Sequence, residues 1–186
     1  MNRNPISLLG LLLLAVTAAL AADKNPVVGG KEMLPGNNIL QNLSRSADHT
    51  TLVKAIKAAG LEETLQGAGP ITIFAPTNKA FAELPEGLFE KLMKPENKEQ
   101  LKKTLLYNMA AGKWTTADLR QKIKESKNGL AELTSLQGAK LKVADHSGMH
   151  LMVRSEDDDI GMFSVWDVAS SNGLIHVVDN VMQLKE

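Results

Sequence analysis

Apolar side chains recur at helical spacing in the first half of the chain, beyond a Gly- and Pro-rich stretch that ends near residue 36. Spacings of three and four place such side chains on one face of a helix. Asp48 or Thr50 can cap one helix, which Gly60 can end in a left-handed conformation. Thr115 or Thr116 can cap the last helix. The predicted helices cover residues 39–43, 50–59, 61–65, 78–84, 88–93, 95–106 and 115–123.

The second half of the chain alternates apolar and polar positions, which is typical of half-buried strands. Leu141 and Val143 alternate with lysines, and Leu151 and Val153 continue the pattern. Turn dipeptides such as Ser147-Gly148 separate these runs. Residues 71–75 form an earlier β-rich run. Helices first and hairpins later predict an α+β fold in a single domain, because a parallel α/β sheet would alternate the two.

The first 21 residues have the layout of a secretory signal peptide. Arg3 supplies a positive charge, residues 6–16 are almost wholly aliphatic, and small residues precede residue 22. The apolar run is short for spanning about 30 Å of hydrocarbon, so no stable membrane span is expected after processing. We therefore expect a cleaved signal peptide over residues 1–21, a flexible leader over residues 22–36 and one folded domain over residues 37–186.

Composition removes several classes of protein. The 186 residues include 21 basic and 21 acidic side chains, whereas a nucleic-acid binder needs a basic excess to neutralise phosphates. Cysteine is absent, which excludes disulfides, thiol nucleophiles and cysteine-ligated metals. Loss of residues 1–21 would remove Arg3 alone among charged groups and leave a net charge of −1.

The chain resembles the fasciclin domain family in two long segments. The first family signature is matched by ITIFAPTNKAFAELP, residues 71–85, and the second by NGLIHVVDNVMQL, residues 172–184. Between them, LLYNMAAGKW, residues 105–114, resembles the central segment of the family. The resemblance extends from residue 37 to residue 184. It is typical of a bacterial secreted protein with a single fasciclin-like domain.

The resemblance implies a wedge-shaped β-sandwich flanked by several short helices. It also implies a secreted or periplasmic, non-catalytic module for adhesion or protein interaction. Its partner would be a protein or matrix component of the cell envelope or the extracellular space, and the domain is taken as a monomer. The alternative is a periplasmic accessory protein that binds a small ligand or a metal.

The signature segments are interpreted as structural junctions. A strand that ends at a proline turns the chain, and the next Thr or Asn can cap the following helix. An Asn-Gly pair forms a tight turn into a buried strand, in which a histidine most simply packs in the core with one satisfied partner. The residues assigned to these roles are Phe74, Pro76, Thr77, Asn78, Asn172, Gly173 and His176.

The central segment departs from its family at one position. Members usually pair Tyr with His there, and in animal members the region is implicated in binding integrins. This chain has Tyr107-Asn108 after Leu105-Leu106, so any interaction that needs an imidazole is lost. We list Leu105, Leu106, Tyr107 and Asn108 as the candidate interaction segment, with Tyr107 expected to be a core anchor.

One short cluster has the side chains of a soft-metal site. His146, Met149, His150 and Met152 lie within seven residues, with Met162 further on, and thioethers with imidazoles suit copper. Ser147-Gly148 also predicts a hairpin turn, and strand methionines usually pack. We therefore expect no bound cofactor. No nucleophile motif of the form GxSxG occurs, and we expect no enzyme activity.

Overall fold

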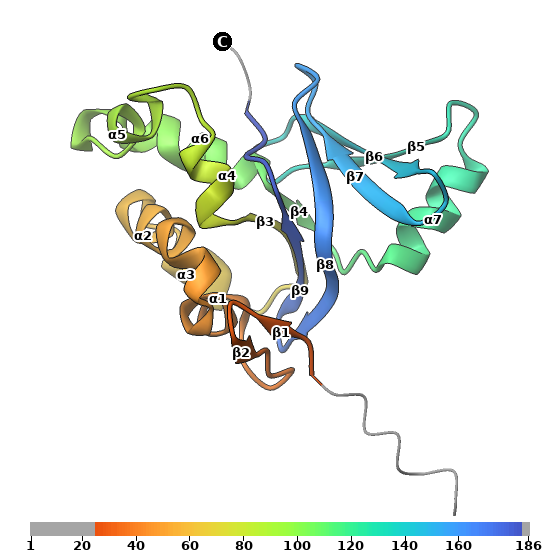
Figure 1. Ribbon diagram of the computed structural model, residues 1–186, viewed down its shortest axis with the longest axis horizontal. Helices are drawn as coiled ribbons and strands as arrows, with labels where there is room; N and C mark the ends of the chain where they lie inside the picture. The colour runs from red at the N-terminus through yellow and green to blue at the C-terminus, as the bar shows by residue number, and fades with distance from the viewer. Residues whose placement is uncertain (1–24, 184–186) are drawn as a thin grey trace, which may run out of the picture.

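The computed structural model describes residues 25–183. All the α-helices but the last gather on one side of the sheet, and the last lies on the other side, beside the hairpin strands (Figure 1). The α-helices are α1 (Ile39–Arg45), α2 (Thr50–Ala59), α3 (Glu62–Gln66), α4 (Asn78–Ala82), α5 (Leu88–Leu92), α6 (Lys98–Tyr107) and α7 (Thr116–Glu125), with 3₁₀ turns η1 (Ala47–His49) and η2 (Pro95–Asn97). The strands are β1 (Val27–Val28), β2 (Lys31–Glu32), β3 (Ile71–Pro76), β4 (Met109–Ala111), β5 (Leu130–Thr134), β6 (Lys140–His146), β7 (His150–Arg154), β8 (Ile160–Ser170) and β9 (Gly173–Val178).

Seven strands form one mixed sheet in the order β4-β3-β9-β8-β7-β6-β5. Strand β8 has two register irregularities between Phe163 and Val168, and such bulges bend a strand and increase its twist. The two ends of the sheet meet through a bridge between Ala110 and Ser135 and a hydrogen bond of 2.8 Å from the Leu136 amide to the Met109 carbonyl. The sheet therefore nearly closes like a barrel. The α+β class and the fasciclin-type fold are confirmed.

The two signature segments lie side by side as the parallel strands β3 and β9. Phe74 is opposite His176 in this register. All six residues of each strand are buried. Strands buried on both faces read as continuous apolar runs, which is why both segments lack the polar alternation of the hairpins.

Strand β3 separates two hydrophobic clusters. Ile73 and Ala75 face the cluster under helices α1 to α6, whereas Phe74 points into the barrel interior. Leu119 of α7 covers the second cluster. Side chains of β3 therefore pack against both cores, so this strand joins the helical side to the sheet.

The segment expected to be a flexible leader contains the β1–β2 hairpin, which corrects that expectation over residues 25–36. Val28 and Met33 are buried in the helical core. The Met33 amide donates to the Pro26 carbonyl at 2.8 Å. Gly-rich composition indicated mobility, but two apolar side chains were enough to dock the segment. The expected signal peptide, residues 1–21, lies outside the described residues.

Two expected helix caps also differ from the structure. Neither Asp48 nor Thr50 caps α2, whose N-cap residue, His49, makes no capping hydrogen bond with its side chain. The His49 side chain is fully buried. Gly60 ends α2 in the left-handed conformation as predicted, with φ of 69°. Thr115 caps α7 in a capping box with Asp118.

Candidate functional site

His176 lies at the centre of an aromatic stack inside the sheet. Its ring centroid is 4.8 Å from that of Phe163 and 5.8 Å from that of Phe74. The Asp167 amide lies 3.3 Å from Nδ1, and Nε2 is 2.8 Å from the Trp114 carbonyl oxygen. An amide can only donate and a carbonyl can only accept, so the proton of the neutral ring is on Nε2. Burial lowers the pKa of His176, against weaker raising effects of the Trp114 carbonyl and Asp167.

Asp167 joins this cluster to helix α7, a role the sequence did not indicate. Its Oδ1 accepts from the Thr116 amide at 2.8 Å, and its Oδ2 accepts from the Thr116 hydroxyl. The residue has φ of 54°, at an irregularity of β8 that turns its side chain toward α7. Only this bulge, invisible in the hydrophobic pattern, places the carboxylate at the helix start.

Asn172 and Gly173 hold three separate elements together. The Asn172 amide nitrogen donates to the carbonyls of Leu65 at 2.8 Å and Gly67 at 3.0 Å, and its oxygen accepts from the Ile39 amide at 2.9 Å. Gly173 has φ of 156°, and a Cβ there would lie 1.8 Å from the Ile71 carbonyl oxygen. The close approach of β3 therefore requires glycine.

Thr77 and Asn78 cap two different helices. Thr77 follows Pro76 and caps α4, and its hydroxyl accepts from the Ala80 amide at 3.3 Å. Asn78 instead reaches across to α2: its oxygen accepts from the Thr51 amide at 2.9 Å, and its nitrogen donates to the Ala47 carbonyl at 2.8 Å. Such a cap between distant segments cannot be inferred from local spacing.

The candidate interaction segment lies mostly inside the protein. Leu105, Tyr107 and Asn108 are buried, and Leu106 is partly buried. The Tyr107 hydroxyl donates to the Lys140 carbonyl at 2.8 Å and accepts from the Glu156 amide at 2.9 Å, and burial raises the pKa of Tyr107. The Asn108 side chain makes two hydrogen bonds with the Met182 backbone, of 2.9 and 3.0 Å.

The residues of the candidate metal cluster lie at the β6–β7 hairpin. His146 and His150 are directly opposite in register, and Met152 lies opposite Ala144. Met149 is in the turn and 69% exposed. Among residues 25–183, no group of three or more His, Asp and Glu side chains is placed to hold a metal ion. A metal at this hairpin would therefore depend on methionine sulfur.

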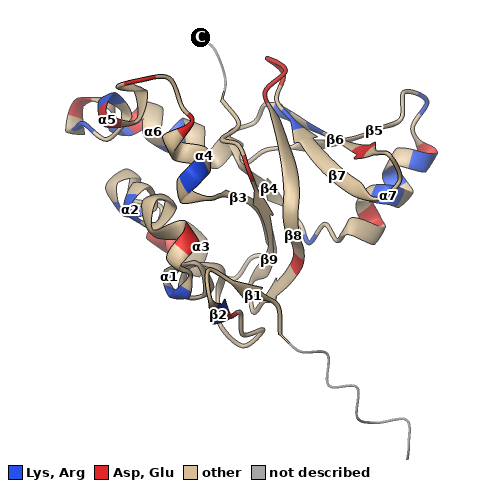
Figure 2. Cartoon of the chain, viewed as in Figure 1, with Lys and Arg blue, Asp and Glu red and all other residues tan. Residues whose placement is uncertain are grey.

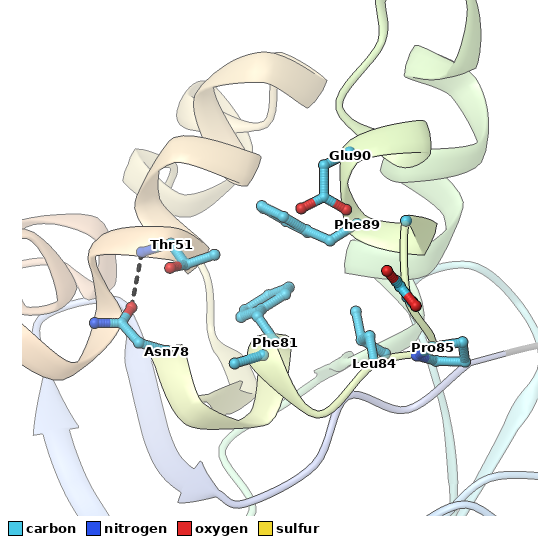
Figure 3. Close-up of a pocket in the computed structure, with 10 residues that line it drawn as sticks. Thr51, Asn78, Phe81, Leu84, Pro85, Phe89 and Glu90 are labelled. Atoms are coloured by element: carbon cyan, nitrogen blue, oxygen red, sulfur yellow. Dashed lines mark hydrogen bonds between the residues drawn. The ribbon is translucent and has the colours of Figure 1, made fainter.

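A groove of about 460 Å³ lies where α2, α4 and α5 meet (Figure 3). Phe81 forms its floor, with a ring centroid 5.3 Å from that of Phe89. Leu84 and Pro85, in the adjoining loop, also line the groove. The sequence showed these residues as apolar helix faces but could not show that they surround a hollow. The position of this hollow depends on how the chain turns at Pro85, between α4 and α5.

The groove offers few free polar groups. At the edge of the groove, the side-chain oxygen of Asn78 is already hydrogen-bonded to the Thr51 amide, and its nitrogen to the Ala47 carbonyl. Glu86 and Glu90 are exposed lining residues. Figure 2 shows blue and red positions side by side on α5 and α7. An apolar floor beside carboxylates suits an apolar side chain flanked by basic residues.

Comparison with known proteins identifies the family. The fasciclin domain model matches residues 47–184, and the chain belongs to the fasciclin domain family. Protein sll1483 of Synechocystis sp. is 36% identical over 174 residues, which cover 94% of this chain and 88% of that protein. The transforming growth factor-beta-induced protein ig-h3 of Sus scrofa is 31% identical over 149 residues, which cover 80% of this chain and 20% of that protein.

The fold agrees with a solved structure of a FAS1 domain pair from the insect cell adhesion molecule fasciclin I. The TM-score is 0.67 at 21% identity, over 81% of this chain and 51% of that one. Fasciclin domains are generally non-catalytic modules that mediate protein interactions. Within residues 25–183, no helix is both long and apolar enough to cross a membrane.

Proposed function

We propose that this protein is a non-catalytic adhesion or protein-interaction module, secreted or periplasmic after removal of residues 1–21. It binds a protein or matrix component of the cell envelope or the extracellular space through the groove between α4 and α5. The observation that carries this proposal is the apolar floor of Phe81 and Phe89 beside exposed Glu86 and Glu90.

Two signature residues, Asn172 and His176, and Asn108 of the central segment support the proposal, because their polar groups are already used inside the protein. Asn172 and Asn108 direct their side chains at the backbone, and His176 has both ring nitrogens engaged inside the sheet. They hold the fold and offer no surface to a partner. The candidate interaction segment, residues 105–108, is likewise buried except for part of Leu106. Partner recognition then falls to a surface that the fold leaves open.

A protein segment fits the groove better than a small polar ligand. Small-molecule sites combine an apolar wall with a few converging polar groups. Here the amide of Asn78 is already used, and the carboxylates of Glu86 and Glu90 are solvent-exposed. A partner that presents one aliphatic or aromatic side chain between Lys or Arg residues would pack that side chain on the apolar floor and pair its charges with the carboxylates.

The test is capture of partners from a cell-envelope fraction, followed by titration of the captured partner against purified protein. The double variant Glu86→Lys/Glu90→Lys reverses the exposed charges and leaves Phe81 and Phe89 in place. We expect its affinity to fall by about tenfold or more, since like charges brought together at an interface cost several kcal/mol.

The matched control is Glu63→Lys/Glu125→Lys, which makes the same change in net charge at residues outside the groove lining. We expect it to bind like the unmodified protein. Equal weakening in both double variants would show that the effect comes from net charge and not from the groove. Unchanged binding in Glu86→Lys/Glu90→Lys would place the contact surface elsewhere.

A further inference from the structure

The outer face of strands β6 to β8 carries an unusual set of neutral, soft donor side chains. Leu151 and Val153 are buried in the barrel core. Side chains alternate between the two faces of a strand, so His150 and Met152 lie on the outer face. His146 is opposite His150 and therefore shares that face.

The register brings a second methionine to the same place. Met162 of β8 is directly opposite Met152 of β7. Directly opposed Cβ atoms are about 4.5–5.5 Å apart, and each methionine has three rotatable bonds, so both sulfur atoms can reach one ion. The Trp166 ring, 42% exposed, meets the His150 ring edge-on at 6.3 Å between centroids. Segments well apart in sequence thus supply one local cluster.

We propose that this face binds one soft monovalent cation of the Cu(I) class through Met152, Met162 and His150. Thioether sulfur prefers such an ion, and imidazole completes a set of neutral ligands. The ring of Trp166 lies edge-on to that of His150, so its emission can report an ion bound there. His146, across from His150, is positioned as a further imidazole.

The surrounding charges select against harder cations. The outer-facing positions of β6 and β7 hold Lys142 and Arg154 but no carboxylate. Arg154 is paired with Asp158 at 2.7 Å. Divalent ions such as Mg²⁺ and Ca²⁺ need oxygen ligands, which these outer-facing positions of β6 and β7 do not supply, and the charge of Lys142 repels a double charge more than a single one. The site therefore favours a single positive charge held by sulfur and nitrogen.

The hairpin that carries the histidines is fixed by α7. Arg120 donates to the carbonyls of Gly148 at 3.2 Å and Met149 at 3.1 Å, and it forms an ion pair with Asp145. The Asp145 carboxylate also accepts from the Gly148 amide at 3.0 Å. This anchoring holds His146 and His150 on adjacent strands. Met149 lies in the turn and is not among the proposed ligands. Met162 takes its place in the group of residues that spacing along the sequence indicated.

The experiment is titration of the purified protein with Ag(I), a redox-inert soft monovalent probe, by calorimetry and tryptophan fluorescence. We expect one Ag(I) per chain and a change in the emission of Trp166 that is absent in Trp166→Phe. In Met152→Leu/Met162→Leu the affinity should fall at least 10–100-fold, the loss already typical of removing a supporting partner of a ligand. Circular dichroism checks that this volume-conserving variant folds.

Met149→Leu is the matched control, because it removes an exposed thioether of the same hairpin that the proposed site does not use. Its Ag(I) affinity should be unchanged. Absence of stoichiometric Ag(I) binding overturns the proposal. So does equal binding by the Met152→Leu/Met162→Leu variant, or loss of binding in Met149→Leu alone. Binding of Zn²⁺ in preference to Ag(I) would also overturn it.

Discussion

Replacement of Asn172 by alanine should destabilise the protein more than any ordinary turn substitution. The side chain makes three hydrogen bonds, to the carbonyls of Leu65 and Gly67 and from the amide of Ile39. These groups are on α3, the segment after it and the start of α1. At about 1 kcal/mol net for each bond, the loss is about 3 kcal/mol, and buried groups left without partners raise it further.

The free energy of unfolding is measured by urea denaturation, with thermal melting as a second readout. For a domain of this size, about 3 kcal/mol corresponds to a fall in Tm of roughly 6–12 °C. The slope of the urea transition should stay constant, because the native surface is unchanged. Asn172→Asp should be no milder than alanine, since it loses the donor and turns a carboxylate toward two carbonyl oxygens.

Asn128→Ala is the matched control. Asn128 also lies in a loop, where its oxygen accepts one exposed hydrogen bond of 3.2 Å from the Leu130 amide. We expect a change within about 0.5 kcal/mol there. A loss below about 1 kcal/mol in Asn172→Ala would refute the view that the second signature segment serves the fold. The residue would then be available for another role.

Two further predictions concern buried polar rings. Tyr107→Ala should cost about 3–5 kcal/mol in urea unfolding, and Tyr107→Phe less, because only the hydroxyl bridge between Lys140 and Glu156 is lost; a normally stable Tyr107→Ala protein would contradict this. Burial lowers the pKa of both His49 and His176 below the ordinary 6.5. The unfolded chain therefore takes up protons first, so this stability is present above pH 6.5 and is lost as the pH drops from 6.5 toward the pKa of the folded state, by at most about 1.4 kcal/mol per pH unit for each ring. Urea unfolding between pH 5 and 7 checks this, and the dependence on pH should become shallower in His49→Gln; stability independent of pH across that window would show that the rings are not held neutral.

Hydrophobic periodicity predicted most elements because most helices and the hairpin strands bury one face. The α+β class followed from their order. Several of the failures come from contacts between distant segments. Asn78 has the sequence context of a local cap, yet it caps α2 because α4 packs beside the start of that helix. The β1–β2 hairpin escaped notice because a two-residue strand has no period.

The candidate sites show the same limit. Spacing grouped Met149 with the histidines, whereas cross-strand register puts Met162 beside Met152 instead. The bulge in β8 that presents Asp167 to α7 has no signal in single-sequence patterning. The groove at Phe81 and Phe89 also needed the packing of α4 against α5, which no property of either helix alone specifies.

Binding through the groove is tested most directly by hydrogen–deuterium exchange of the protein alone and bound to the captured envelope partner. Amides in well-packed strands exchange slowly in both states, whereas a contact surface gains protection on binding. We expect new protection over residues 81–90, around the groove, and no change over residues 105–108. Protection gained at residues 105–108 with none at residues 81–90 would contradict binding through the groove.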